Sequence, residues 1–295
     1  MGNNGRCFGG DSVAQALEFS KSYERVFFRP NPGNAGDSLI NAGFYECAKS
    51  CGLDYIEIVG DFDYSSLRER DLVILSGGGN IVPYWQAGSD LIKELTQYNF
   101  PLMLMPQTVA GREDVLRLLR KEDVLFLRER FSFDYASSLD LKCKVLLDHD
   151  LAFSLRVGRV MERCFFPRLS TKNLRKLIYI FYHYVRSRFV AELKAFRTDR
   201  ESIRPGRYRK INDISSLAKF GTGSADLNYC SSYWMLKILS WYKLVETDRL
   251  HVFVACVLLG KKVTLHSNSY YKNRGVYDHS ISGDEMRSKN VDFVG

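Results

Sequence analysis

The chain has 295 residues, of which 45% are hydrophobic and 26% are charged, a composition typical of a folded globular protein rather than a disordered segment. Its formal net charge of +8 favours anionic partners such as phosphorylated metabolites, lipid-linked phosphates, an acidic membrane surface or nucleic acid. No apolar stretch reaches the roughly 18 residues of a membrane span, and the first residues lack the apolar core of a secretory signal. We therefore expect a cytoplasmic protein, and the length favours two domains.

From about residue 23 to 150, strand-like apolar runs alternate with helical segments, which is the pattern of a βαβ domain. The expected strands lie at 25–29, 55–59, 72–75, 102–105, 124–127 and 144–147. The expected helices lie near 38–51, 86–98 and 112–120. In a parallel sheet the loops that follow the strands share one edge, so this edge should collect the chemistry.

The loop 31–38 follows the first of these strands and leads into a helix. Its glycines permit a tight turn with exposed backbone N–H groups. The segment lacks the Lys-Ser/Thr of a P-loop and the third glycine of a dinucleotide fingerprint, which argues against ordinary ATPase or NAD chemistry. Asn34, Gly36 and Asp37 are therefore candidates for ligand contact, while a helix cap is the alternative role of Asp37.

Polar residues also follow the later strands. Three consecutive glycines at 77–79 are costly in conformational entropy, so Gly78, Gly79 and Asn80 are candidates for a backbone that approaches a ligand closely; a plain turn is the alternative. Gln107, Arg128 and Arg130 follow the next two strands and fit either a site wall or an interior polar network. The sequence Asp148-His149-Asp150 predicts no metal site, because neighbouring side chains on a strand point in opposite directions.

Residues 156–193 interrupt this rhythm. The piece 174–186 mixes aromatic residues with cations at helical spacing, which fits either a helix with a solvated basic face or attachment to an acidic membrane surface. We predict an N-terminal Rossmann-like domain over 1–155, a basic aromatic insert over 156–193 and a C-terminal Rossmann-like domain over 194–295.

The most informative stretch is 247–273. Arg249 and His251 stand immediately before an apolar run that ends at Gly260, which is where an anion would meet a helix start. Thr247 or Asp248 could cap this helix. The strand expected at 262–266 would deliver Asn268 and Lys272 to the next loop. Two alternatives are open. One is an ion pair of Arg249 with the neighbouring Asp248 or Glu246, and the other is a structural role for His251.

Seven short motifs occur in series from about residue 25 to 280, and together they resemble the polysaccharide pyruvyl transferase family. These motifs are Gly33–Asp37, Gly77–Asn80, Pro106–Thr108, Arg128–Ser132, Asp148–Phe153, Phe196–Asp199 and Thr247–His251. The resemblance implies two Rossmann-like domains facing across a cleft, as in GT-B glycosyltransferases. It also implies transfer of a pyruvyl group from phosphoenolpyruvate to two hydroxyls of a sugar in a cell-surface polysaccharide or its precursor.

Within that family the histidine that matches His251 is regarded as essential, and an arginine of the motif that contains Arg128 and Arg130 is implicated. Protonation of the enolpyruvyl methylene needs an acid that titrates near neutrality, so His251 is the expected proton donor. Arg249, Arg128, Arg197 and Lys272 are candidates to hold the phosphate and carboxylate groups. Asp37 and Asp148 are both candidates for the base, and the scheme needs no metal or separate cofactor.

Two other functions fit the same residues. One is a nucleotide-sugar-dependent glycosyltransferase with the same fold, and the other is a non-catalytic binding or scaffold protein that docks to a membrane or a partner. A lipid-linked acceptor and peripheral contact with the inner face of an acidic membrane remain open. Nucleic-acid binding is not expected, because the cations are dispersed and no nucleic-acid module is recognisable.

Overall fold

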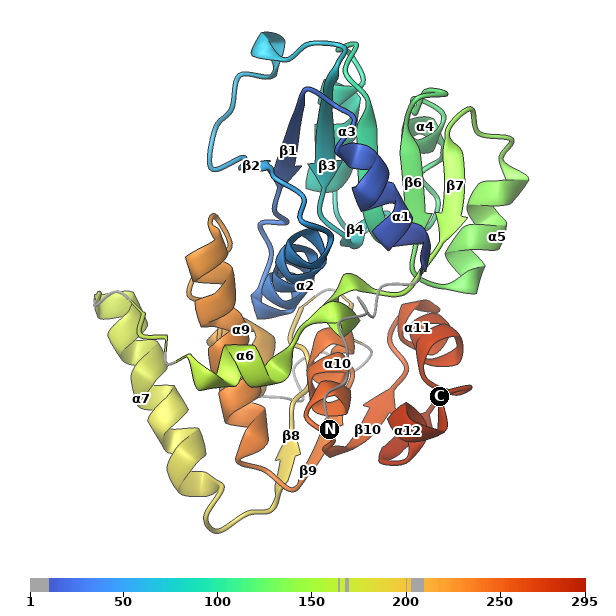
Figure 1. Cartoon of the computed structure of the whole chain (residues 1–295). Coiled ribbons are helices and arrows are strands. Elements are labelled where there is room, and N and C mark those ends of the chain that lie inside the picture. The colour runs from blue at the N-terminus through green and yellow to red at the C-terminus, as the bar shows by residue number, and fades with distance from the viewer. Residues whose placement is uncertain (1–10, 164, 168–169, 200, 203–209) are drawn as a thin grey trace. The chain divides into compact units, whose positions relative to one another are not determined.

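The computed structural model describes residues 11–163, 165–167, 170–199, 201–202 and 210–295. Contacts divide the chain into two compact units. The N-terminal unit contains the residues up to Asn31 and Gly43–Ser154, and the C-terminal unit contains Pro32–Ala42 and the residues from Leu155 onward. Each unit has its own parallel sheet (Figure 1), so the predicted α/β class is confirmed.

The N-terminal unit is built on one parallel sheet of seven described strands. Across the sheet the strands are β2 (Ile56–Glu57), β1 (Arg25–Arg29), β3 (Asp71–Leu75), β5 (Leu102–Val109), β6 (Val124–Leu127) and β7 (Lys144–Leu147), with β4 (Gly78–Ile81) paired to β5. Every residue of β3 and β5 is buried, as expected for a parallel sheet covered on both faces. The strand order reverses between β1 and β3, and such switch points are where open α/β sheets bind ligands.

The helical elements that accompany this sheet are α1 (Asp11–Ser20), α2 (Ala35–Cys51), η1 (Tyr64–Ser66), α3 (Ala87–Leu95), α4 (Glu113–Leu116), α5 (Arg130–Ser138) and η2 (Leu151–Ser154). In α3 the buried residues Ser89, Ile92 and Leu95 recur at every third position, so one stripe of the helix faces the core. Helix α2 ends before Gly52, whose φ of 63° suits a glycine helix terminator.

The C-terminal unit has a second parallel sheet of four described strands, which lie in chain order. They are β8 (Glu192–Lys194), β9 (Leu244–Thr247), β10 (Lys262–His266) and β11 (Val291–Val294). The accompanying helices are α6 (Val157–Glu162), α7 (Thr171–Arg186), η3 (Lys210–Asn212), α8 (Ile214–Leu217), α9 (Ala225–Ser240), α10 (Leu250–Leu258), α11 (Lys272–Ser280) and α12 (Glu285–Ser288). The apolar helix α10 packs on β9, β10 and α9 (Figure 1), and Gly260 with a φ of 64° follows its end.

The structure differs from the sequence expectation at one place in each unit. The glycine segment 77–79 is not only a turn, because Gly78 and Gly79 belong to β4, where Gly78 pairs with Gln107 and Ile81 with Val109. Lys272 is not in a loop, because it begins α11. In both cases pairing or packing with distant residues determines the local structure.

Of the described cysteines, Cys47, Cys143, Cys230 and Cys256 are buried, and Cys51 is partly buried. Cys7 and Cys164 lie outside the described residues. None of the helices in the described part of the chain combines the length and the apolar composition needed to cross a membrane.

His183 fixes the inner face of α7 to the rest of the C-terminal unit. Its side chain is fully buried, with Nδ1 2.8 Å from the Tyr242 hydroxyl and Nε2 2.9 Å from the Ile211 carbonyl oxygen. Burial lowers the pKa of His183, although the Ile211 carbonyl opposes that shift.

Since the unfolded chain then binds the proton more tightly than the folded protein, we expect a pH-dependent loss of stability. The contribution of His183 is fully present above its ordinary pKa of about 6.5 and is lost as the pH falls below it. Urea unfolding measured from neutral to mildly acidic pH should show this slope in the wild type and a shallower slope in His183→Gln. Identical slopes would contradict the assignment.

Candidate functional site

Three neighbouring strands of the C-terminal unit end in polar residues at the same edge of the sheet. The chain after β8 reaches Arg197, β9 leads to Asp248 and Arg249, and β10 leads to Asn268. The backbone N–H of Arg197 donates to Asp248 Oδ1 at 2.8 Å. Burial raises the pKa of Asp248, and this hydrogen bond opposes that shift. Residues 51 positions apart are thus held together where ligands of α/β sheets are usually bound.

Buried charged side chains at this edge form a network that we call the Arg249 cluster. Its members are Arg197, Asp199, Glu201, Asp213, Arg249 and Lys272. Arg249 Nη1 lies 2.8 Å from Asp199 Oδ2, and its Nη2 pairs with Asp213. Arg249 does pair with carboxylates, but the alternative of an ion pair with the neighbouring Asp248 or Glu246 is wrong, because its partners come from distant segments.

Glu201 is the second anionic centre of the Arg249 cluster. It pairs with Arg197 Nη1 and with Lys272 Nζ, and Asn268 Nδ2 donates to it at 3.4 Å. Arg197 also binds Asp199, with Nε 2.7 Å from Asp199 Oδ1. The structure therefore brings together Arg197, Arg249, Asn268 and Lys272, all of which the sequence predicts as binding residues. An external anion at Arg197 or Lys272 would compete with Glu201.

Pairing within the Arg249 cluster shifts the pKa values of Asp199 and Arg197. Burial alone would raise the pKa of Asp199, but hydrogen bonds and charge from Arg197 and Arg249 hold that pKa below its ordinary value. Burial also disfavours the Arg197 guanidinium, yet Asp199 and Glu201 raise its pKa. Among the described buried atoms, Arg249 Nε and Asn268 Oδ1 have no hydrogen-bond partner. This leaves one donor and one acceptor for a ligand or water, since buried polar atoms are normally satisfied.

Helix α10 begins directly beside the Arg249 cluster. Its N-cap residue is Arg249, whose side chain makes no capping hydrogen bond to the helix. The predicted cap by Thr247 or Asp248 is therefore wrong. Thr247 instead accepts from the Arg249 backbone N–H at 3.0 Å and donates to the Ala195 carbonyl at 2.6 Å. His251 lies in the first turn of α10 and is partly exposed.

The start of α2, which belongs to the same unit, lies against His251. A Cβ placed on Gly36 would be 2.7 Å from His251 Nδ1 and 2.8 Å from His251 Cβ, distances that no side chain tolerates. Asn34 Oδ1 accepts from the Gly36 N–H at 2.8 Å, and Asp37 Oδ2 accepts from the Asn34 N–H at 2.7 Å. These reciprocal bonds cap the helix. His251 therefore lies between the first turns of two helices, with Asn34, Gly36 and Asp37 nearby.

A separate polar network occupies the switch point of the N-terminal unit. Asn31, after β1, donates to the Gly77 carbonyl at 3.2 Å, and Asn80 donates to Asn31 Oδ1 at 2.8 Å. Gln107 Nε2 donates to the Ser76 carbonyl at 2.8 Å, while its buried Oε1 has no partner. The sequence placed Asn80 and Gln107 in the loops after two strands, but they lie within the paired strands β4 and β5. Gly78 has a φ of 147°, which a side chain would strain.

Arg128 is one of the largest fully buried side chains of the described residues. Its Nη1 lies 2.6 Å from Asp150 Oδ2, and its Nε donates to Thr108 Oγ1 at 2.9 Å. Only 1% of either charged side chain is exposed. This geometry matches the alternative of an interior polar network, because the ion pair joins the ends of β5 and β6 to the chain after β7.

The other residues of these loops also serve the fold. Glu129 is the N-cap of α5 and accepts from the Ser132 N–H at 2.9 Å. Arg130 is exposed, with its guanidinium 5.6 Å from the centre of the Phe133 ring. Asp148 accepts from the backbone N–H of Val13 at 2.8 Å.

Within the described residues, no group of three or more His, Cys, Asp or Glu side chains could hold a metal ion. Asp148 and Asp150 both accept backbone hydrogen bonds, Asp148 from His149 at 2.6 Å and Asp150 from Ala152 at 2.9 Å.

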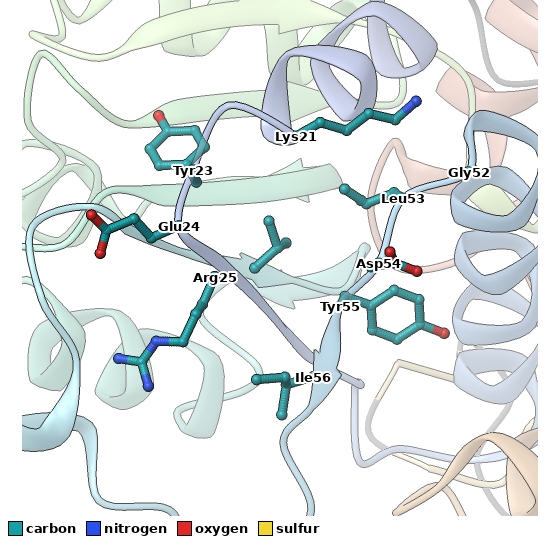
Figure 2. A pocket seen from close by; sticks show the side chains of 10 residues that line it. Lys21, Tyr23, Glu24, Arg25, Gly52, Leu53, Asp54, Tyr55 and Ile56 are labelled. Atoms are coloured by element: carbon teal, nitrogen blue, oxygen red, sulfur yellow. The ribbon is translucent and has the colours of Figure 1, made fainter.

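One cavity of about 480 Å³ opens on the N-terminal unit, away from its switch point. Figure 2 shows Lys21, Arg25, Asp54 and Tyr55 among the side chains that line it. These residues stand at or before the amino ends of β1 and β2, the opposite edge of the sheet from Asn31 and Gly77. Burial raises the pKa of Tyr55 to about 12. None of the predicted site residues lines this cavity.

The sequence alone did not identify the acidic members of the Arg249 cluster or Asn31 as site residues. Asp213 caps α8 by accepting from the Ser216 N–H, so its sequence signal was that of a cap. Asp199 and Glu201 alternate with Arg197, which was a usable signal for a charge network. Their partners Arg249 and Lys272 are about 50 and 71 residues away along the chain, and no local pattern reveals that contact.

Comparisons with known proteins agree with these motifs. A family model described as polysaccharide pyruvyl transferase matches residues 34–270. A comparison with curated proteins finds no match. Among solved structures, the chain is similar to the crystal structure of a functionally uncharacterized protein from Klebsiella pneumoniae. The two are 29% identical, the match covers 96% of this chain and 97% of that chain, and the TM-score is 0.75.

Proposed function

Because the chain belongs to the polysaccharide pyruvyl transferase family, we propose that it moves a pyruvyl group from phosphoenolpyruvate to two hydroxyls of a sugar. The product is a cyclic ketal on a cell-surface polysaccharide or its precursor. The observation that carries the proposal is the position of His251, which lies in the first turn of α10 and against the first turn of α2. An imidazole thus lies at the N-terminal ends of two helices, two residues after Arg249 in the chain, and helix N-termini favour an anionic enol ether that the imidazole could protonate.

In the proposed reaction His251 gives a proton to the methylene carbon of phosphoenolpyruvate, which becomes a methyl group. The adjacent carbon becomes cationic, and a sugar hydroxyl attacks it to form the first C–O bond. The C–O bond to phosphate then breaks and phosphate leaves with its electron pair. A second hydroxyl closes the ring, and the two hydroxyl protons pass to the base and to solvent.

The Arg249 cluster is the proposed site of the donor's phosphate and carboxylate. Arg197, Arg249 and Lys272 supply the cationic donors, and Arg249 Nε is a buried donor without a partner. Planar guanidinium groups suit both anions of phosphoenolpyruvate. Its binding would replace carboxylate contacts, above all those that Glu201 makes with Arg197 and Lys272.

Donor choice can be measured without knowing the acceptor. Thermal unfolding should shift upward with phosphoenolpyruvate, because a ligand at 100 times its Kd stabilises the folded state by about 2.7 kcal/mol. UDP- and GDP-sugars should give no shift. Protection by a nucleotide sugar and none by phosphoenolpyruvate would instead support a glycosyltransferase.

Asp37 is the proposed base that accepts a proton from the sugar. It belongs to the same unit as His251 and lies one residue after Gly36, whereas Asp148 binds the backbone N–H groups of Val13 and His149 in the N-terminal unit. Asp37 also caps α2 through the Asn34 N–H.

The variant Asp37→Asn separates these two roles, because an amide oxygen can still accept the capping bond but cannot take up the proton. We expect unchanged urea stability within about 1 kcal/mol and a fall in pyruvyl transfer of about 100-fold or more. Asp37→Ala should lose both. Full activity in Asp37→Asn would limit Asp37 to capping.

Gly36→Ala should lower activity even though alanine favours a helix. A new Cβ would push against the His251 ring, and a misplacement of about 1 Å can cost roughly 100-fold in rate. The matched control is Gly158→Ala in α6, where a Cβ meets nothing within 4 Å. The control should keep full activity. Steady-state phosphate release measures both variants, and equal activities would contradict the proposed contact.

The N-terminal unit is proposed to bind the saccharide acceptor. Gly78, Gly79, Asn80 and Gln107 lie at or beside its switch point, and Gln107 Oε1 is a buried acceptor without a partner. Hydroxyl groups of a sugar are suitable donors for such an atom. The GT-B-like arrangement of two domains across a cleft, which the family resemblance implies, belongs to this proposal, as does contact of Arg130 with substrate.

A further inference from the structure

Helix α7 presents an unusual outward face. Its inner face contains Ile180 and His183, which are buried, and Lys176, whose Nζ binds the Lys219 carbonyl oxygen. At its C-terminal end Tyr184 packs against Trp241, with ring centres 5.4 Å apart. These contacts fix which side of α7 faces the C-terminal unit.

The opposite side of α7 is apolar. Its residues recur at intervals of four, three and four, which places them on one helical face. We call this face the outer stripe, and it consists of Leu174, Ile178, Phe181 and Val185. Ile178 is 59% exposed and Phe181 is 64% exposed. Large side chains with this much contact to water, gathered on one face, mark an interaction surface.

Exposed apolar residues continue along the chain after α7 ends. Phe189 is 84% exposed and Val190 follows it, so the apolar surface extends past the helix end. Tyr179 and Tyr182 are also exposed and carry the combination of ring and hydroxyl that suits a membrane–water boundary.

The charged residues of α7 and of the segment that follows it to Val190 are all positive. Residues 171–190 contain five lysines and arginines, Lys172, Arg175, Lys176, Arg186 and Arg188, and no aspartate or glutamate. Lys172, Arg175 and Arg188 are exposed. A helix with an apolar stripe, exposed cations and no acidic residue of its own complements an anionic lipid surface, which accepts apolar side chains and attracts each cation.

We propose that α7 lies in the interface of an anionic membrane, with the outer stripe inserted among the lipids and the flanking cations at the headgroups. The sequence also allowed a helix with a solvated basic face, and the outer stripe adds an apolar face beside the exposed cations Lys172 and Arg175. The inference is independent of the proposed chemistry, since lipid binding needs neither phosphoenolpyruvate nor a saccharide.

The test is flotation of the purified full chain with two kinds of vesicle, phosphatidylcholine alone and phosphatidylcholine mixed with phosphatidylglycerol. We expect binding to the mixed vesicles that weakens as the salt concentration is raised, because salt screens the attraction between the cations and the anionic lipids. Phe181→Ser should weaken binding by about ten-fold or more. Arg175→Glu should also weaken it, with a smaller dependence on salt.

The matched control is Met286→Ser on α12, which removes an apolar side chain that is 88% exposed on another helix. It should bind like the wild type. Circular dichroism and thermal unfolding verify that each variant is folded. Equal binding to both vesicles, or unchanged binding by folded Phe181→Ser, would overturn the proposal. So would a dimer in light scattering that dissociates in Phe181→Ser while vesicles capture nothing, because a second copy would then cover the stripe.

Discussion

His251→Ala should fold like the wild type and lose pyruvyl transfer by about 100- to 10,000-fold, the usual contribution of a positioned acid. The imidazole lies against the first turn of α2, and the two bonds that cap α2 do not use His251, so the variant should keep that helix start intact. Steady-state phosphate release from phosphoenolpyruvate with the acceptor measures the loss.

Two comparisons make this result specific. Added imidazole should restore part of the activity of His251→Ala, because it can occupy the space of the missing side chain and deliver a proton. His279→Ala, on α11, removes a histidine outside the proposed site and should remain active. Undiminished activity in folded His251→Ala would show that another group protonates the donor.

Arg128→Met should destabilise the protein by about 3–5 kcal/mol in urea unfolding. Its side chain and Asp150 are each only 1% exposed, so the substitution leaves the Asp150 carboxylate buried without its counter-charge. Asp150→Leu alone should be similarly destabilising, because it leaves the guanidinium unpaired.

The double variant Arg128→Met with Asp150→Leu should recover most of that stability, since replacing both members of a buried ion pair with apolar residues is often nearly neutral. It also tests the catalytic role that the family resemblance implies for Arg128. Activity in the stable double variant would restrict Arg128 to holding β5 and β6. A stable but inactive double variant would show that Arg128 acts on the substrate. Wild-type stability in Arg128→Met would contradict the buried pair.

The sequence was sufficient for elements whose local pattern and tertiary role agree. The strands predicted at 25–29, 124–127 and 144–147 coincide with β1, β6 and β7, because each is a short apolar run bounded by polar residues. It was insufficient for β4, where two glycines and an asparagine carry no strand preference and pairing with β5 supplies the structure. Helix α11 was missed in the same way, since Lys272 and Asn273 are buried by contacts that its sequence does not encode locally.

The sequence also predicts only part of the candidate site. The basic members of the Arg249 cluster could be identified because each follows a strand of a predictable sheet. Their carboxylate partners could not, because Glu201 meets Lys272 across 71 residues of sequence. The role of Gly36 was visible as a permissive turn residue, but the approach of His251 to its Cα depends on folding of the whole C-terminal unit.

The most direct test of the central claim is mass spectrometry of saccharides after reaction in D₂O. The purified protein is incubated with phosphoenolpyruvate and with polysaccharide and lipid-linked saccharide fractions from cells that make it. We predict a pyruvyl ketal on one fraction, with one deuterium in its methyl group, and no such product with His251→Ala. Intact phosphoenolpyruvate and unmodified saccharides would contradict pyruvyl transfer, and a ketal without deuterium would contradict protonation of the methylene carbon by an exchangeable acid.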